Sequence, residues 1–416
     1  MGGGFWPMID VLVSVAFYLS VFSLAFILFA VAESAAQSVA NSDGTYLRVS
    51  VLPHAIAGIA ILLLCMIAAL RADTVGVDTS LYPDVYMSAA ATSESFFGFV
   101  SNEQLMPLEE PFHAILVWLC SRITSNKALL LFCYQFLTIV PVYIAAYKLR
   151  KYMPLSICMA VYMLFFYNNS LNLMRQSIAC AFLLLAFAYL IDKKRMSIGF
   201  FLCSVSAVLF HRSGLYGFVL ILIASLISKV QHKQIKAALY VSILILPMIV
   251  FPVANGLVNL GLADSHLQIY LNTFENLDEN SVYYFNPLSL HSLCYLFIYG
   301  WLVALPYIGV KLPVVGSSKN EEAEFTGIQR YVNSVPLMGY LIYAALLFAL
   351  YTSYGSRFSL FLDFFMIFSL SLFCTGEKAH QRKILVLGSL IVVWLIWVVR
   401  LGWSASVPYG FNTLIW

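Results

Sequence analysis

Long apolar segments alternate with short polar segments along almost the whole chain. A helix that crosses a bilayer needs about 20 mostly apolar residues, because the hydrocarbon core is about 30 Å thick and each residue rises 1.5 Å. The apolar runs are 8–31, 52–70, 127–147, 153–167, 174–191, 197–211, 213–228, 236–254, 288–309, 336–352, 357–375 and 383–401. The pattern predicts an all-α polytopic integral membrane protein, a single transmembrane domain over 1–416 with about twelve transmembrane helices (10–13).

Three parts of the pattern need separate interpretation. The apolar run 112–122 is too short to cross a bilayer, so we expect a re-entrant or interfacial helix there. The stretch 197–228 is interrupted by a polar turn at 211–214, which favours two helices over one. The run 8–31 follows no basic residue and exceeds the apolar core of a signal peptide, so we expect it to be a retained span.

Composition supports this fold class. Hydrophobic residues make up 62% of the chain and charged residues only 10%, whereas soluble domains carry about 25% charged residues. These values exclude a soluble enzyme, a disordered scaffold and a nucleic-acid binder. The net charge of +3 is too small to indicate a polyanionic partner.

Most basic residues lie in alternate loops. They are Arg48; Lys148, Arg150 and Lys151; Lys193, Lys194 and Arg195; Lys229, Lys233 and Lys236; Lys311, Lys319 and Arg330; and Lys378, Arg382 and Lys383. The positive-inside rule predicts that these loops are cytoplasmic, including the longest of them, 310–335. Both termini and two larger loops, 71–111 and 255–287, are then expected on the outer face.

The outer loops are richer in candidate chemistry than the cytoplasmic ones. No phosphate-binding glycine motif occurs in the cytoplasmic loops, which argues against an ATP- or nucleotide-sugar-dependent reaction there. The outer loops interleave acidic residues with Tyr and Phe. Carboxylates accept hydrogen bonds from sugar hydroxyls while ring faces cover apolar CH patches, so the pattern suits a sugar ligand. A solvated outer loop is equally compatible with most of these acids.

Four arginines stand at the outer ends of spans: Arg71, Arg175, Arg212 and Arg357. A guanidinium is always charged and grips phosphate oxygens with two parallel hydrogen bonds. Arg175 and Arg357 lie near helix N-termini, where the helix dipole also favours an anion. Single arginines at such positions often only snorkel to the interface. Several together predict a diphosphate site.

Other polar residues are less specific. His211 could titrate, orient a ligand or be a buried hydrogen-bonded ring. Asp363 lies within a predicted span and must be paired or face a cavity. No His, Cys, Asp or Glu set has metal-ligand spacing, so the sequence gives a metal no support without excluding one, and it predicts no cofactor. No nucleophile-elbow motif is present.

Short motifs resemble those of the EpsG-like family of bacterial polysaccharide polymerases, which are Wzy-type proteins. In chain order they are Arg71 with VGVDTSLY (Val75 to Tyr82), EEPFHAIL (Glu109 to Leu116), NLMRQSIA (Asn172 to Ala179), FHRSGL (Phe210 to Leu215), SYGSRFSLFL (Ser353 to Leu362) and VPY (Val407 to Tyr409). They cover nearly the whole chain in the family's order. The resemblance implies a membrane enzyme with a GT-C-like arrangement, by analogy at the level of fold.

The resemblance also implies a reaction. Such proteins polymerise undecaprenyl-diphosphate-linked oligosaccharide repeat units at the outer (periplasmic or extracellular) face of the bacterial inner membrane. The growing chain passes to a new lipid-linked unit with release of the lipid diphosphate. The expected stereochemistry is inversion at the anomeric carbon. The product would be O-antigen, capsule or exopolysaccharide, and the partners would be the lipid-linked donor and acceptor, membrane lipid, a Wzx-type flippase and a Wzz-type chain-length regulator.

This chemistry assigns roles to the candidate residues. The departing diphosphate needs fixed cations, for which we expect Arg175, Arg212 and Arg357, then Arg71. The acceptor hydroxyl needs a base, for which we expect Asp78 first, Glu110 second and His211 third. The residues expected to hold sugar or diphosphate oxygens are Gln176, Tyr82 and Tyr354.

Two other function classes fit parts of the pattern. An O-antigen ligase or another outer-face lipid-linked transferase shares the donor diphosphate, so the arginines do not separate it from a polymerase. A flippase for the same lipid-linked unit fits twelve spans, but the sequence has no internal repeat and its candidate residues lie at one face. A purely structural membrane subunit would leave the outer arginines unexplained.

Overall fold

The computed structural model describes residues 8–40, 51–79, 82–101, 109–259, 288–308, 319–350, 355–400 and 406–411. Within these ranges the chain is helical and forms no strand beyond an isolated bridge between Arg71 and Phe411. The predicted all-α class is therefore confirmed. The chain divides into two compact units, which we call the N-terminal unit (described residues up to Leu215 and from Leu370) and the central unit (Tyr216 to Ser369).

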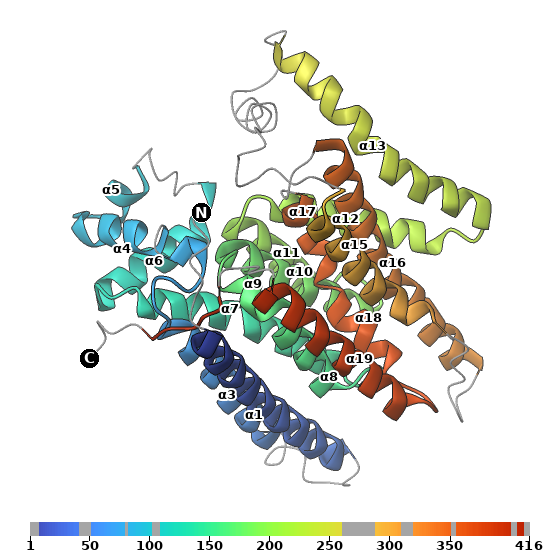
Figure 1. The fold of residues 1–416 in the computed structure, drawn as a ribbon, viewed down its shortest axis with the longest axis horizontal. Helices are drawn as coiled ribbons and strands as arrows, with labels where there is room; N and C mark the ends of the chain where they lie inside the picture. Colours follow the sequence, from blue (N-terminus) through green and yellow to red (C-terminus); the bar gives the residue numbers. More distant parts are fainter. Residues whose placement is uncertain are drawn as a thin grey trace. The chain divides into compact units, whose positions relative to one another are not determined.

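Figure 1 traces the helices of both units. Those of the N-terminal unit are α1 (Met8–Ala40), α3 (Val51–Ala69), η1 (Val77–Thr79), α4 (Tyr82–Thr92), α5 (Phe96–Val100), α6 (Pro111–Ile123), α7 (Ala128–Lys148), α8 (Leu155–Val161), η3 (Tyr162–Phe166), α9 (Tyr167–Ser170), α10 (Met174–Lys193), α11 (Ile198–Phe210), α19 (Ala379–Trp394) and η5 (Leu395–Arg400). Those of the central unit are α12 (Gly214–Lys229), α13 (Lys233–Asn259), α15 (Leu290–Ala304), η4 (Leu305–Tyr307), α16 (Lys319–Leu350) and α17 (Gly355–Asp363), and the residues of α18 (Met366–Phe373) divide between the units.

Six helical stretches of the described chain are long and apolar enough to cross a membrane. They are Met8–Ser38, Val51–Ala69, Ala128–Lys148, Met174–Lys193, Phe325–Phe348 and Ala379–Val399. Four shorter apolar helices accompany them: Pro111–Ile123, Ile198–Phe210, Gly214–Lys229 and Ser292–Tyr307. The protein is therefore a multi-pass membrane protein, while the number of about twelve crossings and the single transmembrane domain stay predictions.

The turn at 211–214 separates two helices, as its polar residues indicate. The His211 amide donates to Ala207 O and closes α11, and the Gly214 amide donates to His211 O as α12 begins. A Cβ on Gly214 would lie 2.9 Å from Ala207 O, so only glycine allows this approach. The turn holds His211 and Arg212 at the end of α11.

Some predicted segments differ from the observed helices. Helix α16 begins at Lys319, so a large part of the predicted cytoplasmic loop 310–335 is helical. The predicted span 153–167 is built from α8, the π-helix η3 and α9. Most of the predicted outer loop 255–287 lies outside the described residues.

The predicted outer loop 71–111 is largely folded. Helices α4, α5 and α6 pack on α7 and α10, and their shared core includes Tyr86, Phe99, Val117, Leu130 and Ile178. Figure 1 shows α4, α5 and α6 gathered together in this unit. The run predicted at 112–122 is α6, whose re-entrant or interfacial placement stays a prediction.

A C-terminal segment, 406–411, ties the first helices of the N-terminal unit together. The Tyr409 amide donates to Ser14 Oγ on α1 over 2.8 Å. The Tyr409 hydroxyl donates to Ile67 O on α3, also over 2.8 Å. The last described residues therefore link the beginning of α1 to the end of α3, from which the chain enters the 71–111 region.

In the central unit, the side chain of Asp363 is paired, as expected for an acid in a predicted span. Its side chain is buried, accepts a hydrogen bond from the Tyr299 hydroxyl, and accepts another from Ser359 Oγ at 2.9 Å. A Cβ on Gly339 would lie 2.6 Å from Asp363 Oδ1. These contacts join α15, α16 and α17.

Candidate active site

The first residues of α6 position a buried carboxylate. Pro111 is the first residue of the helix, a place where its missing N–H is not needed and its fixed φ suits the helix. Glu110 is the N-cap, but its side chain does not cap the helix. Instead the carboxylate extends toward the beginning of α10 and the end of α11.

Glu110 joins two of the other predicted site residues. Arg175 Nη1 donates to Glu110 Oε2, and His211 Nδ1 contacts Glu110 Oε1. Because an ionised carboxylate only accepts hydrogen bonds, Nδ1 carries the imidazole hydrogen in this arrangement. Three segments distant in sequence therefore converge on one carboxylate, which is 8% exposed.

The surroundings of Glu110 keep it ionised. Burial alone would raise its pKa, but the hydrogen bond from His211 and the positive charge of Arg175 outweigh burial and lower the pKa to about 2. Glu110 is thus negatively charged at neutral pH and only weakly basic. Its arrangement suits orienting Arg175 and His211 better than accepting a proton.

Arg175 is the second residue of α10, and aromatic rings flank its guanidinium. The guanidinium carbon lies 5.8 Å from the ring centroid of Tyr82 and 5.6 Å from that of Tyr86. Tyr82 is exposed and Tyr86 is buried. The next residue, Gln176, is buried on α10. The site around Arg175 thus combines a cation, a helix N-terminus and a tyrosine at the surface of the unit.

A second ion pair lies beside the first in sequence. Arg212 Nη1 is 2.6 Å from Glu109 Oε2, and the two side chains are 46% and 35% exposed. Exposed ion pairs are worth only about 0–1 kcal/mol, because water competes for both charges. An anionic ligand can therefore displace Glu109 from Arg212 at little cost.

Arg71, the third predicted phosphate-binding arginine of this unit, is 1% exposed. Its guanidinium donates to Thr79 Oγ1 at 3.1 Å, to Ala68 O at 2.8 Å and to Leu171 O at 2.9 Å. Burial lowers the pKa of Arg71 to about 10, which leaves it protonated at neutral pH. The geometry makes Arg71 the centre of the turn that follows α3. Its predicted contact with diphosphate stays a prediction.

That turn carries Asp78. The Asp78 amide donates to Asn172 Oδ1 over 2.9 Å, so η1 docks on the corner before α10. Gly76 precedes it with a φ of +89°, and a Cβ there would lie 3.2 Å from Leu171 O. Asp78 is half-buried. The neighbouring Ala72 amide donates to Gly410 O over 2.7 Å, which links the turn to the C-terminal segment.

Two predicted site residues do not belong to the described part of the N-terminal unit. Arg357 is an exposed residue of α17 and belongs to the central unit. Tyr354 lies outside the described residues. The structure thus brings together Glu110, Arg175 and His211, with Tyr82 beside Arg175.

The sequence analysis missed several polar contacts in the N-terminal unit. His113 is buried, its Nε2 lies 2.6 Å from the Tyr134 hydroxyl, and its ring packs edge-on against Tyr86. Lys127 Nζ pairs with Asp73 at 2.7 Å and Asp84 at 2.5 Å. The spacing of His113, one helical turn after Glu110, is the signal that could have placed it on the same face of α6.

Metal chemistry has no geometric support in the described part of the chain. No three His, Cys, Asp or Glu side chains of those residues are grouped as a metal site requires. The chemistry available at the cluster is that of an arginine, an imidazole and an ionised carboxylate.

Comparison with known proteins bears on what these residues do. The sequence model of the EpsG family matches residues 54–412, which include every motif around the cluster. The chain belongs to the EpsG family. EpsG proteins are polysaccharide polymerase-like membrane proteins, so membership indicates a polymerase-like function of the glycosyltransferase kind. No curated protein and no solved structure matches this EpsG chain.

Proposed function

We propose that this EpsG protein polymerises undecaprenyl-diphosphate-linked oligosaccharide repeat units at the outer face of the bacterial inner membrane. The observation that carries the proposal is the carboxylate of Glu110 between Arg175 and His211. Each of the three residues belongs to a different motif of the family, and together they supply an anion-binding group beside a group that can accept a proton.

The reaction is a displacement at the anomeric carbon of the growing chain. The acceptor hydroxyl oxygen forms the new glycosidic bond, the bond from that carbon to the lipid diphosphate breaks, and the hydroxyl proton moves to a base. The diphosphate departs with the bonding electron pair and gains negative charge. A direct displacement of this kind inverts the anomeric centre and needs no nucleotide sugar, because the bond to the carrier already stores the driving energy.

Of the three predicted bases, Asp78, Glu110 and His211, the arrangement of hydrogen bonds favours His211. Glu110 accepts the hydrogen on Nδ1, which leaves Nε2 as the nitrogen that can take the proton. A buried carboxylate that fixes an imidazole tautomer in this way also stabilises the imidazolium that forms. Glu110 is then the positioning residue of the pair.

We assign the leaving diphosphate to the arginines. Arg175 is the principal ligand for two reasons. It stands at the N-terminus of α10, where the helix dipole favours an anion, and one of its five N–H donors already binds an anionic group, the Glu110 carboxylate. Arg212 joins it on release from Glu109. Arg357 and Arg71 are the further candidates. Arg71 would act indirectly, because it holds the turn after α3 in place.

The remaining assignments concern the sugars and the partners. Tyr82 and Gln176 are proposed to hold sugar or diphosphate oxygens, with Tyr354 as a third group. The lipid-linked donor and acceptor reach the site from the bilayer. A Wzx-type flippase would deliver them and a Wzz-type regulator would set the chain length.

A deletion strain complemented with variants tests the proposal by the surface glycan profile on a gel. His211→Gln and Arg175→Ala are expected to abolish the long ladder while single repeat units still reach the surface. His54→Gln is the matched control, since His54 Nδ1 contacts the Tyr143 hydroxyl at 2.9 Å, away from this cluster, and should preserve the ladder. Lipid-linked units trapped on the cytoplasmic leaflet would instead identify a flippase and refute the proposal.

A further inference from the structure

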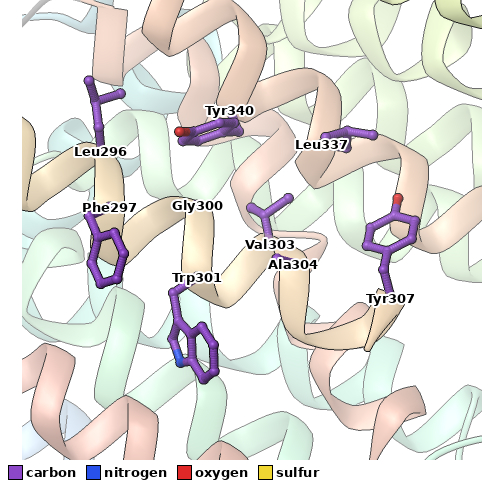
Figure 2. A pocket seen from close by; sticks show the side chains of 9 residues that line it. All are labelled: Leu296, Phe297, Gly300, Trp301, Val303, Ala304, Tyr307, Leu337 and Tyr340. Carbon is purple, nitrogen blue, oxygen red and sulfur yellow. The ribbon is translucent and has the colours of Figure 1, made fainter. Parts of the chain in front are cut away.

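The central unit contains an apolar cavity of about 620 Å³ along α15, η4 and α16. Figure 2 shows the side chains that line it, among them Phe297, Trp301 and Val303 of α15 and Leu337 and Tyr340 of α16. Phe297 and Trp301 are exposed. Such a groove on a membrane protein is filled by hydrocarbon, and by itself it selects no particular lipid.

A second cavity of about 370 Å³ adjoins the first and has a different character. It shares Tyr307 and Leu337 with the apolar cavity. Most of its other lining residues carry polar groups, and they include Lys236 and Tyr240 of α13 and Gln329, Arg330 and Asn333 of α16. The two cavities therefore adjoin across Tyr307 and Leu337, and we call the first the apolar end and the second the polar end.

The polar end carries positive charge from two helices. Lys236 and Arg330 both line it, and none of its lining residues is acidic. Lys236 is half-buried and Arg330 is exposed. Two cations brought to one polar recess repel each other, and an anion between them removes that repulsion. The recess therefore fits a phosphate group.

The wall between the two ends is fixed by hydrogen bonds. The Tyr307 hydroxyl donates to Asn333 O over 2.9 Å, and Ser369 Oγ donates to Asn333 Oδ1 over 2.8 Å. The first bond holds the backbone carbonyl of Asn333 and the second its side-chain amide. A molecule that fills both ends needs an apolar tail and an anionic head.

We propose that this cavity binds one anionic glycerophospholipid, with its phosphate between Lys236 and Arg330 and an acyl chain along α15. Basic pockets between membrane helices bind such headgroups at the cytoplasmic side. Lys236 and Arg330 adjoin loops that the charge pattern predicts to be cytoplasmic, so the lipid comes from the inner leaflet. The proposal does not rest on the proposed reaction, which is assigned to the outer face.

Native mass spectrometry of the purified full chain, titrated with phosphatidylglycerol or with phosphatidylcholine of the same acyl chains, tests the proposal. The wild type is expected to retain phosphatidylglycerol preferentially. Lys236→Gln and Arg330→Gln should each weaken that binding about fivefold, and the double variant about 25-fold, if the two charges act independently. Lys233→Gln, an exposed change one turn earlier on α13, should leave binding unchanged.

A steric variant tests the apolar end. Ala304→Trp fills the groove at an exposed position and should weaken retention of phosphatidylglycerol with both charges in place, while the variant elutes as the wild type does. Equal retention of the two lipids, an equal loss in Lys233→Gln, or preferential retention of a polyprenyl phosphate in competition would overturn the proposal. A lipid-free dimer mediated by this face would overturn it as well.

Discussion

Replacing Glu110 by glutamine isolates the charge at the centre of the candidate site, because the two side chains have nearly the same shape. In the folded protein the pKa of Glu110 is lowered from 4.5 to about 2, since the hydrogen bond from His211 and the charge of Arg175 outweigh burial. A difference of this size corresponds to about 3 kcal/mol of stability at pH 7. Glu110→Gln is expected to lose about that amount, because Arg175 and His211 lose their shared partner.

The sign of the pH dependence follows from the direction of the shift. A carboxylate whose pKa is lowered on folding stabilises the protein above its unfolded pKa, and that contribution disappears as the pH falls toward the folded pKa. The contribution of Glu110 is therefore about 3 kcal/mol at pH 7 and about 1 kcal/mol at pH 3. The wild type and Glu110→Gln should approach each other in stability as the solution is acidified.

Unfolding by sodium dodecyl sulfate in mixed micelles, followed by tryptophan fluorescence at both pH values, measures this difference. Glu109→Gln is the matched control. Its partner Arg212 is exposed, and breaking such a pair costs about 0–1 kcal/mol at either pH. If Glu110→Gln were as mild as the control at pH 7, or equally destabilising at pH 3 and pH 7, the argument from charge would be refuted.

Three further predictions concern activity and local structure. His211→Asn is expected to lower the rate of chain extension by about 10²–10⁴-fold in a reconstituted assay with lipid-linked units. The amount of folded protein should not change. An unchanged rate would show that His211 is not the base. Arg175→Lys and Arg357→Lys should each lower that rate about 10- to 100-fold, because the charge is kept but the planar fork is lost, and full activity in both would contradict the diphosphate assignment. Gly76→Ala is expected to destabilise the protein by about 1–2 kcal/mol because of its positive φ, whereas Gly327→Ala on α16, where a Cβ meets nothing within 4 Å, should not destabilise it in the same unfolding measurement.

The sequence predicted the helices well where hydropathy and helix formation coincide. The span 174–191 is α10, and the polar turn after Phe210 separates α11 from α12. Where the two signals differ, hydropathy misplaced the boundary. The polar residues that begin α16 at Lys319 were interpreted as a loop, although Glu, Ala and Gln are good helix formers.

The candidate site could be predicted as a set of residues but not as an arrangement. Glu110 meets Arg175 across 65 residues and His211 across 101, and no local periodicity encodes such contacts. Periodicity also could not reveal that Glu110 joins the other two. Arg71 is a sharper case, because two of its partners are backbone carbonyl groups, which any residue supplies.

The C-terminal segment has a consequence for the order of synthesis. The Tyr409 hydroxyl bonds to Ile67 across 342 residues, and a ribosome adding about 5–20 residues per second needs roughly 17–70 s to cover that distance. During this time the beginning of α1, the end of α3 and the turn that carries Arg71 lack their contacts with the C-terminal segment 406–411. The turn that carries Arg71 therefore gains its contacts with 406–411 only long after α1 and α3 have been synthesised.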